Sequence, residues 1–157
     1  MSVVGDMVSG KVGKRILIAA YGDGYENTGS SSRCYAGFGV KNILHYDQEL
    51  FSVRSNQFVC KKAGDYLVRY YFKLSRSNSS PQNGIQYTVQ TKRGTTTTNI
   101  ANGSKTSLAV ETGSSVVSLA VDDLLYAYCT EFFLSGQTGG VYLESSNVEV
   151  GIYVTEA

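Results

Sequence analysis

The stretch Asn56–Leu74, NQFVCKKAGDYLVRYYFKL, decides the fold class of this chain. It predicts a strand, a tight turn at residues 63–65 and a long strand with tyrosines on both faces, because side chains in a strand alternate between two faces. One face carries Tyr, Val, Phe and Leu and suits a sandwich core. The other sets Leu67 and Tyr71 among charged residues, and an isolated soluble domain has little reason to leave them in water. We therefore expect a partner on that second face.

Composition limits the chain to one domain. It has 157 residues, of which 42% are hydrophobic and only 17% are charged. A chain of this length builds one core of ordinary size, and many Ser, Thr, Gly and Tyr with little charge favour strands over helices. We expect an arm at residues 1–14, where the valines follow no clean period, and an all-β domain at residues 15–157.

Charge and hydropathy argue against two classes of partner. The formal net charge is +1, with basic residues spread along the chain, so we expect no nucleic-acid binding. No run approaches the roughly 20 apolar residues that span a bilayer, and the opening MSVVGDMVSGKVGKR lacks the apolar core of a signal peptide. We expect no membrane binding, and release by a route such as lysis for any role outside the cell.

Turn signals divide the domain into about ten short strands, the pattern of an antiparallel all-β sandwich. Segments such as IQYTVQTK and SLAVET alternate between apolar and polar, with separate strands expected before and after Gly113. Residues 95–105 are expected to form a polar connection. Four segments are instead apolar on nearly both faces: RILIAAY (15–21), DYLVRYYF (65–72), DLLYAYC (123–129) and VEVGIYV (148–154). A sandwich with one sheet wet outside and the other covered on both faces gives this division.

The order of these segments, together with a short motif, resembles a known family. The signature Phe-x-Cys-x-x-x-Gly-x-Tyr stands here at Phe58, Cys60, Gly64 and Tyr66, with Ala63 in place of a usual proline. It is typical of the jelly roll shared by the globular heads of complement component one subcomponent q and the tumour necrosis factor ligands.

Two further elements of that family follow in the right order. Leu-x-x-Gly-Asp-x-Val-x-Leu is similar to residues 119–127, where Asp122 replaces the glycine. Phe-x-Gly-Phe-Leu is similar to residues 149–153, where Gly151 matches and Glu149 replaces the first Phe. The resemblance covers roughly residues 40–157.

The resemblance implies a ten-strand jelly roll that assembles as a homotrimer, with the inner sheets around a threefold axis. In the family the inner sheet holds the first, third, sixth and last main strands, which we match to the four segments that are apolar on both faces. Complement-type members carry a collagen-like stalk, but no Gly-X-Y period precedes residue 15 here. We therefore expect the head itself to set the trimer and the arm at residues 1–14 to attach it to a larger object.

Tyrosines on these four strands are the expected interface. Alternation sends about half of them into the core, and the others face the axis. An aromatic side chain buries roughly 150–250 Å², or about 4–6 kcal/mol gross, so a few in each of three chains make the assembly obligate. The predicted interface residues are Leu67, Tyr71, Tyr126, Tyr128 and Tyr153.

Catalytic chemistry finds little support. His45 is the only histidine, so a Ser-His-Asp or Cys-His device depends on it alone, and no nucleophile elbow accompanies it. We expect no catalytic residues and a surface or loop position for His45. Cys34, Cys60 and Cys129 have neither metal-ligand spacing nor a disulfide framework, and we expect buried thiols.

Asp122 and Asp123 are weak candidates for a metal site, because a hard cation such as calcium accepts carboxylate oxygens. Two carboxylates fall short of the roughly six to eight oxygens that calcium takes. A solvated turn between two strands is the favoured interpretation, and we predict neither a metal nor a cofactor.

The predicted function is a non-catalytic homotrimeric structural or adhesive module, located in a bacteriophage virion as a capsid or tail decoration or a fibre head. Other virion or surface proteins would bind through the arm. The alternative is a carbohydrate- or receptor-binding head of a bacterial surface protein, located extracellularly or on the cell. Clusters of Tyr and Asn at residues 25–27 and 99–102 are candidate loops for such a glycan or receptor.

Overall fold

The computed structural model describes residues 15–23, 26–28, 31–34, 42–75, 83–133 and 148–157. The arm expected at residues 1–14 lies outside them. The described residues form twelve strands: β1 (Ile16–Asp23), β2 (Glu26–Thr28), β3 (Ser31–Cys34), β4 (Ile43–Tyr46), β5 (Phe51–Arg54), β6 (Gln57–Cys60), β7 (Gly64–Leu74), β8 (Asn83–Arg93), β9 (Thr96–Lys105), β10 (Ala109–Leu119), β11 (Leu124–Phe133) and β12 (Val148–Glu156). In this part of the chain, no helix is long and apolar enough to cross a membrane.

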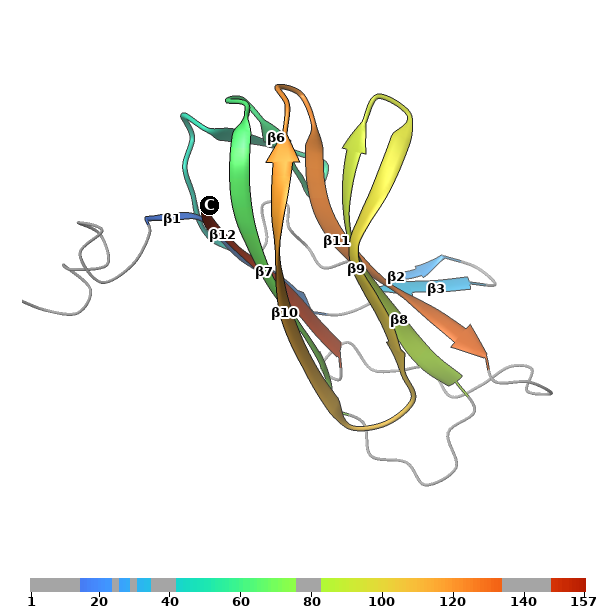
Figure 1. Cartoon of the computed structure of the whole chain (residues 1–157). Helices are drawn as coiled ribbons and strands as arrows, with labels where there is room; N and C mark the ends of the chain where they lie inside the picture. Colours follow the sequence, from blue (N-terminus) through green and yellow to red (C-terminus); the bar gives the residue numbers. More distant parts are fainter. Residues whose placement is uncertain (1–14, 24–25, 29–30, 35–41, 76–82, 134–147) are drawn as a thin grey trace, which may run out of the picture.

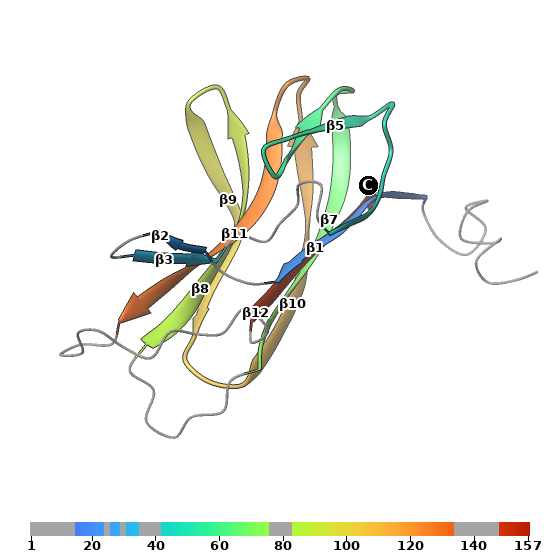
Figure 2. The ribbon, with the colours of Figure 1, turned by 180° about the vertical axis from the view of Figure 1, so that it is seen from behind.

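Two antiparallel sheets face each other across the core (Figure 1). The first sheet has the order β10-β7-β12-β1-β4. In the second sheet β11 is central: β8 and then β9 continue from one edge, while β6 and β3 pair with different parts of the other edge. The first and last described strands, β1 and β12, lie side by side, as Figure 2 shows from behind. This arrangement confirms the predicted all-β jelly-roll sandwich.

The alternation predicted for β7 is confirmed. Val68 and Phe72 are completely buried, whereas Leu67 and Tyr71 are half-buried and Arg69 is exposed on the opposite face. The strand begins one residue earlier than expected, at Gly64, so the preceding turn falls at residues 61–63. Because β6 and β7 belong to different sheets, that turn carries the chain across the core.

Aromatic contacts join the two sheets inside the core. Phe72 of β7 stacks on Tyr87 of β8, with ring centroids 4.7 Å apart and an interplanar angle of 18°. Phe51 contacts Tyr66 at 5.2 Å. An aromatic ring buries roughly 150–250 Å², which corresponds to about 4–6 kcal/mol gross, so these rings are a main source of the sandwich's stability.

The assignment of DLLYAYC to the same sheet as β1, β7 and β12 is wrong. This segment lies in β11, the central strand of the second sheet. A central strand has neighbours on both edges, so its outer face is also partly covered and tolerates Tyr126 and Tyr128, which are half-buried. The position beside β7 in the first sheet belongs to β10 instead.

Two further expectations are corrected. Residues 95–105 are not a connection but mainly β9, which follows β8 through a turn where Gly94 has φ of 60°, a conformation that favours glycine. Asn99 and Asn102 therefore lie in a strand and not in a loop. The expected break at Gly113 is absent, since β10 runs through it unbroken. The ring of Tyr70 lies over that glycine and fills the space that a side chain would take.

Candidate functional site

The outer face of the first sheet gathers aromatic, apolar and charged side chains, and we call it the tyrosine face. Register pairs β7 with both β10 and β12, so residues from three strands share this face. They are Leu67, Arg69, Tyr71 and Lys73 of β7, Glu149, Gly151 and Tyr153 of β12, and Val110, Thr112, Ser114 and Val116 of β10.

Tyr71 is held across β12 by two features. Gly151 lies opposite it in register, and a Cβ atom at this glycine would lie 2.1 Å from Tyr71 Cε1. The ring therefore occupies the space that the glycine leaves open, as in other cross-strand pairs of aromatic residues with glycine. Its hydroxyl donates a hydrogen bond to Glu149 Oε1 at 2.5 Å. The orientation of Tyr71 is thus fixed before any partner binds.

Beside Tyr71 the tyrosine face is hollowed. A shallow groove of about 460 Å³ is lined by Arg69, Tyr71 and Tyr153 together with residues of β10. Arg69 lies opposite both Tyr153 and Ser114 in register. The groove combines aromatic surface with a cation, a composition that is enriched at protein interfaces.

Two valines complete the apolar part of this face. Val110 is 66% exposed and Val116 is 61% exposed. Because full burial of a valine contributes about 1.5–3 kcal/mol, covering these exposed fractions yields about 1–2 kcal/mol gross for each. Tyr71 and Tyr153 are already half-buried within the chain, so each has less to gain from a partner than the 4–6 kcal/mol of a fully exposed ring.

Arg69 and Lys73 bring positive charge to the same face. Both side chains are exposed, and the ion pairs found among the described residues involve neither of them. An unpaired cation is costly to bury. A partner on the tyrosine face must therefore leave these two groups at a wet rim or offer them carboxylates.

The structure brings together only part of the predicted interface. Leu67, Tyr71 and Tyr153 share the tyrosine face, whereas Tyr126 and Tyr128 lie on the outer face of the other sheet. These five residues do not form one surface on a single chain. Their roles in assembly stay predictions. Val110 and Val116 were missed for two reasons. The alternation of SLAVET predicts that Val110 faces the core, and Val116 is followed by Val117, so the sequence does not show which of the two faces outward.

The outer face of the second sheet carries a chain of polar contacts that we call the amide chain. Tyr126 donates a hydrogen bond to Gln90 Oε1 at 2.8 Å, and Gln90 Nε2 donates to Asn99 Oδ1 at 2.6 Å. The ring of Tyr126 stacks on Tyr128 with centroids 6.2 Å apart. Burial raises the pKa of Tyr126, so its hydroxyl stays a hydrogen-bond donor at neutral pH. Aromatic rings beside amides suit carbohydrate recognition.

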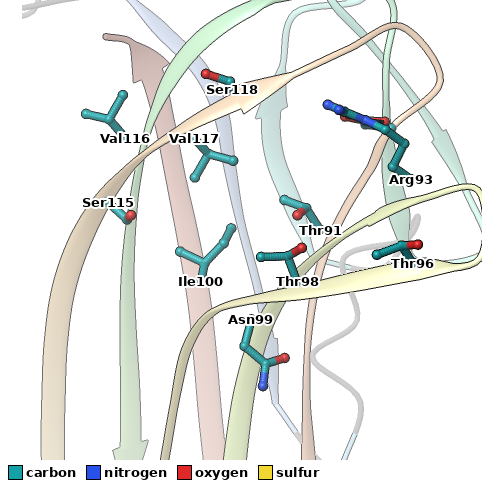
Figure 3. A pocket seen from close by; sticks show the side chains of 11 residues that line it. Thr91, Arg93, Thr96, Thr98, Asn99, Ile100, Ser115, Val116, Val117 and Ser118 are labelled. Atoms are coloured by element: carbon teal, nitrogen blue, oxygen red, sulfur yellow. Dashed lines mark hydrogen bonds and ion pairs between the residues drawn. The ribbon is translucent and has the colours of Figure 1, made fainter.

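A cleft of about 620 Å³ opens between β9 and β10, at the edge where the two sheets diverge. Figure 3 shows Ile100 and Val117 in it, with threonines of β8 and β9 around them. Arg93 donates to both carboxylate oxygens of Asp123, from Nε at 3.0 Å and from Nη2 at 2.7 Å. This ion pair holds the pKa of Asp123 below its ordinary value.

The weak metal candidates do not form a ligand set. Asp123 is buried and its oxygens accept from Arg93 and from the Ala120 backbone N–H at 2.9 Å. Asp122 is exposed in the turn, with φ of 74°. Within the described ranges no group of three or more His, Cys, Asp or Glu side chains is arranged to hold a metal ion. The turn at Asp122 and Asp123 places the Asp123 carboxylate for its ion pair with Arg93.

His45 has a structural contact. It lies exposed on β4, at the edge of the first sheet, with Nε2 3.1 Å from the backbone oxygen of Ile16. Cys60, the buried cysteine of the family signature, donates from Sγ to the backbone oxygen of Lys62 at 3.1 Å, and burial raises its pKa. A thiol of this kind is a poor nucleophile.

This chain resembles known proteins in its structure but not in its sequence. No protein-family model and no curated protein matches the sequence. Murine APRIL, solved at pH 8.5, superposes with a TM-score of 0.56 at 7% identity, over 90% of this chain and 99% of that chain. The globular domain of zebrafish complement 1qA gives 0.53 at 9% identity, over 88% and 94%. The chain therefore has the jelly-roll fold shared by the tumour necrosis factor ligands and the complement globular heads.

Proposed function

We propose that this chain is a non-catalytic homotrimeric module that assembles through the tyrosine face. The observation that carries the proposal is the concentration of Tyr71, Tyr153, Val110 and Val116 on one sheet face. Exposed apolar patches rimmed by polar groups mark interaction sites. The fold supports the same conclusion, because the family resemblance implied a trimer built on this sheet.

A second copy of the chain is the partner that best fits this face. Most soluble homo-oligomers have closed symmetry, and a threefold arrangement brings three tyrosine faces toward one axis. The valines at the β10 edge then lose their contact with water. Lys73 lies near the end of β7 and stays at the hydrated rim of the interface, where charges are tolerated. Arg69 lines the groove between Tyr153 and β10, so the neighbouring copy must offer it a carboxylate or leave it hydrated.

Native mass spectrometry and sedimentation at micromolar concentration test the assembly. The parent chain is expected to be a trimer, and Tyr71→Asp is expected to be a folded monomer, because it places a carboxylate beside Glu149 in the interface. Tyr126→Asp is the matched control on the opposite sheet and is expected to stay trimeric. A monomeric parent refutes the assembly. A monomeric Tyr126→Asp beside a trimeric Tyr71→Asp would move the interface to the second sheet.

The proposed biological role is a component of a bacteriophage virion, as a capsid or tail decoration or a fibre head. What supports it is a jelly-roll head with a sheet face suited to assembly with further copies of the chain. Quantitative mass spectrometry of purified particles from the host that encodes the chain tests this role. We expect the protein at a fixed copy number that is a multiple of three. Its absence from purified particles refutes the role without affecting the trimer.

A carbohydrate- or receptor-binding head is the second candidate, and the amide chain favours it. Tyr126, Gln90 and Asn99 present a ring and two amides on a surface that the tyrosine-face trimer leaves open. A glycan array with the parent, Asn99→Ala and Tyr71→Asp separates the two roles. Binding that Asn99→Ala abolishes while the trimer persists supports this candidate, and a parent that binds no glycan counts against its carbohydrate form.

A further inference from the structure

Two cysteines occupy directly opposed positions in the second sheet. β3 runs antiparallel to β11, and the register pairs Cys34 with Cys129 and Arg33 with Thr130. Cys129 is completely buried. The sequence gives no hint of this pairing, because the two cysteines lie far apart along the chain and only the β3–β11 contact brings them opposite each other.

The backbone separation of such a pair suits a disulfide. Directly opposed residues of antiparallel strands have Cα atoms about 4.5 or 5.5 Å apart, depending on the type of pair. Disulfides join Cα atoms about 4.4–6.8 Å apart, so both types qualify. Cys60 is placed differently: it pairs with Phe51 of β5 in register. The register therefore favours one cysteine pair, Cys34 with Cys129.

We propose that Cys34 and Cys129 form a cross-strand disulfide when the chain meets an oxidising environment. Cys129 is a buried thiol in the structure, so the proposal concerns an oxidised form. With a small disulfide such as oxidised glutathione as oxidant, one cysteine thiolate attacks it and releases one glutathione thiol. The second thiolate attacks the mixed disulfide and releases the other. Two electrons and two protons thus pass from the cysteine pair to two glutathione molecules.

The bond fastens the β2–β3 hairpin to the sandwich. In the described part of the chain β2 pairs only with β3, and β3 joins the sheet through the two register pairs given above. The disulfide closes a loop of about 95 residues and restrains the unfolded chain, which is expected to raise the melting temperature by roughly 5–15 °C. Neither the bond nor its test depends on the proposed assembly or biological role.

The test determines the state of all three cysteines in the full chain. The protein is equilibrated with oxidised glutathione and then unfolded with iodoacetamide but without reductant. Intact mass and non-reduced peptide mapping follow. We expect a single alkylated cysteine, Cys60, and one cross-linked peptide that joins Cys34 to Cys129. Alkylation of all three cysteines, glutathione adducts without a cross-link, or a cross-link to Cys60 overturns the proposal.

Two serine variants separate the bond from its effect on stability. Cys60→Ser is the matched control and should retain the cross-linked peptide and the fall in melting temperature on reduction. Cys34→Ser should lose both. A reductant-dependent melting shift that survives in Cys34→Ser refutes stabilisation by this pair. The peptide map of the parent chain decides the existence of the bond even where a variant fails to fold.

Discussion

Substitution of Gly151 by alanine is the sharpest perturbation of the tyrosine face. The new Cβ would lie 2.1 Å from Tyr71 Cε1 and 2.6 Å from Cζ. Carbon atoms in contact are ordinarily about 3.5–4.0 Å apart, so the ring must retreat by about 1.4 Å or more. The Tyr71 hydroxyl then cannot keep its 2.5 Å hydrogen bond to Glu149. A single methyl group therefore removes the pre-set orientation of the central tyrosine.

The expected cost follows from three contributions. A hydrogen bond to a charged acceptor is worth about 1.5–3 kcal/mol, and the half-buried Glu149 places this bond at the lower end. Overpacking adds about 1–3 kcal/mol. The lower entropy of the unfolded alanine chain offsets about 0.4–1 kcal/mol. The net loss is about 1.5–4 kcal/mol of unfolding free energy for each chain, or a fall in melting temperature of roughly 3–16 °C.

Gly113→Ala provides the matched control. A Cβ there would lie 2.1 Å from the Tyr70 hydroxyl oxygen, and Tyr70 packs toward the core and contacts Tyr87 at 6.4 Å. Each substitution thus places a methyl group against a tyrosine of β7, and the two tyrosines lie on opposite faces of that strand. Urea unfolding and native mass spectrometry are measured for both. We expect both variants to lose stability. Gly151→Ala should weaken the trimer more than Gly113→Ala, which borders the groove but leaves Tyr71 in place.

Two results would refute this reasoning. If Gly151→Ala unfolds at the same urea concentration as the parent, Tyr71 does not lie over the glycine as described. If Gly113→Ala dissociates the trimer and Gly151→Ala does not, the interface does not use the tyrosine face. Each 1.4 kcal/mol lost from an interface weakens it about tenfold, so the difference between the variants is measurable by dilution.

Three further predictions concern the sandwich itself. Phe72→Ala removes a completely buried ring that stacks on Tyr87 and is expected to cost about 3–5 kcal/mol in urea unfolding. Tyr87→Phe keeps that ring but loses the hydroxyl that donates to Glu111, at a cost of about 1 kcal/mol at neutral pH. Because Lys105 and Tyr87 lower the pKa of Glu111, this difference should shrink as the pH falls below about 4.5 and Glu111 is protonated; an unchanged difference at low pH contradicts it. Asp123→Asn should remove the stability that the ion pair with Arg93 gives the folded state. In the parent this stability is present above about pH 3.9 and is lost as the pH falls through the lowered pKa of Asp123. The unfolding free energy of Asp123→Asn should therefore decrease less on acidification than that of the parent.

The sequence predicted the parts of the fold that depend on one strand at a time. The alternation of β7, with Phe72 inside and Tyr71 outside, is a property of the strand itself. The short motif at Phe58 and Cys60 then suggested the jelly roll, which the solved structures support. Both signals are local, and both were sufficient to predict the fold class.

Properties that depend on pairing were not predicted. β11 and β7 both carry apolar side chains on nearly both faces, yet they lie in different sheets. Sheet membership depends on which strands form hydrogen bonds with each other and not on the period of either one. The ring of Tyr70 covers Gly113, which explains why β10 does not break at this glycine. Tyr70 lies more than forty residues before Gly113 in the sequence, so no local pattern could predict the contact. β9 looked like a connection because an edge strand exposes its Thr and Asn side chains to water.

Glu149 is the residue that departs most from the family pattern, and the structure accounts for it. In the family pattern Phe-x-Gly-Phe-Leu a phenylalanine occupies this position and would add to the hydrophobic surface of the sheet. Here Glu149 accepts the hydroxyl of Tyr71, while Gly151, the matching residue, makes room for the ring. Glu149 and Tyr71 therefore act as a pair, in which a hydrogen-bonded carboxylate and phenol replace apolar surface. An interface built this way needs its hydrogen bond satisfied before association, because an unpaired buried carboxylate is costly. Tyr71 supplies that bond within each chain, so the tyrosine face can be covered by a partner without leaving Glu149 unpaired.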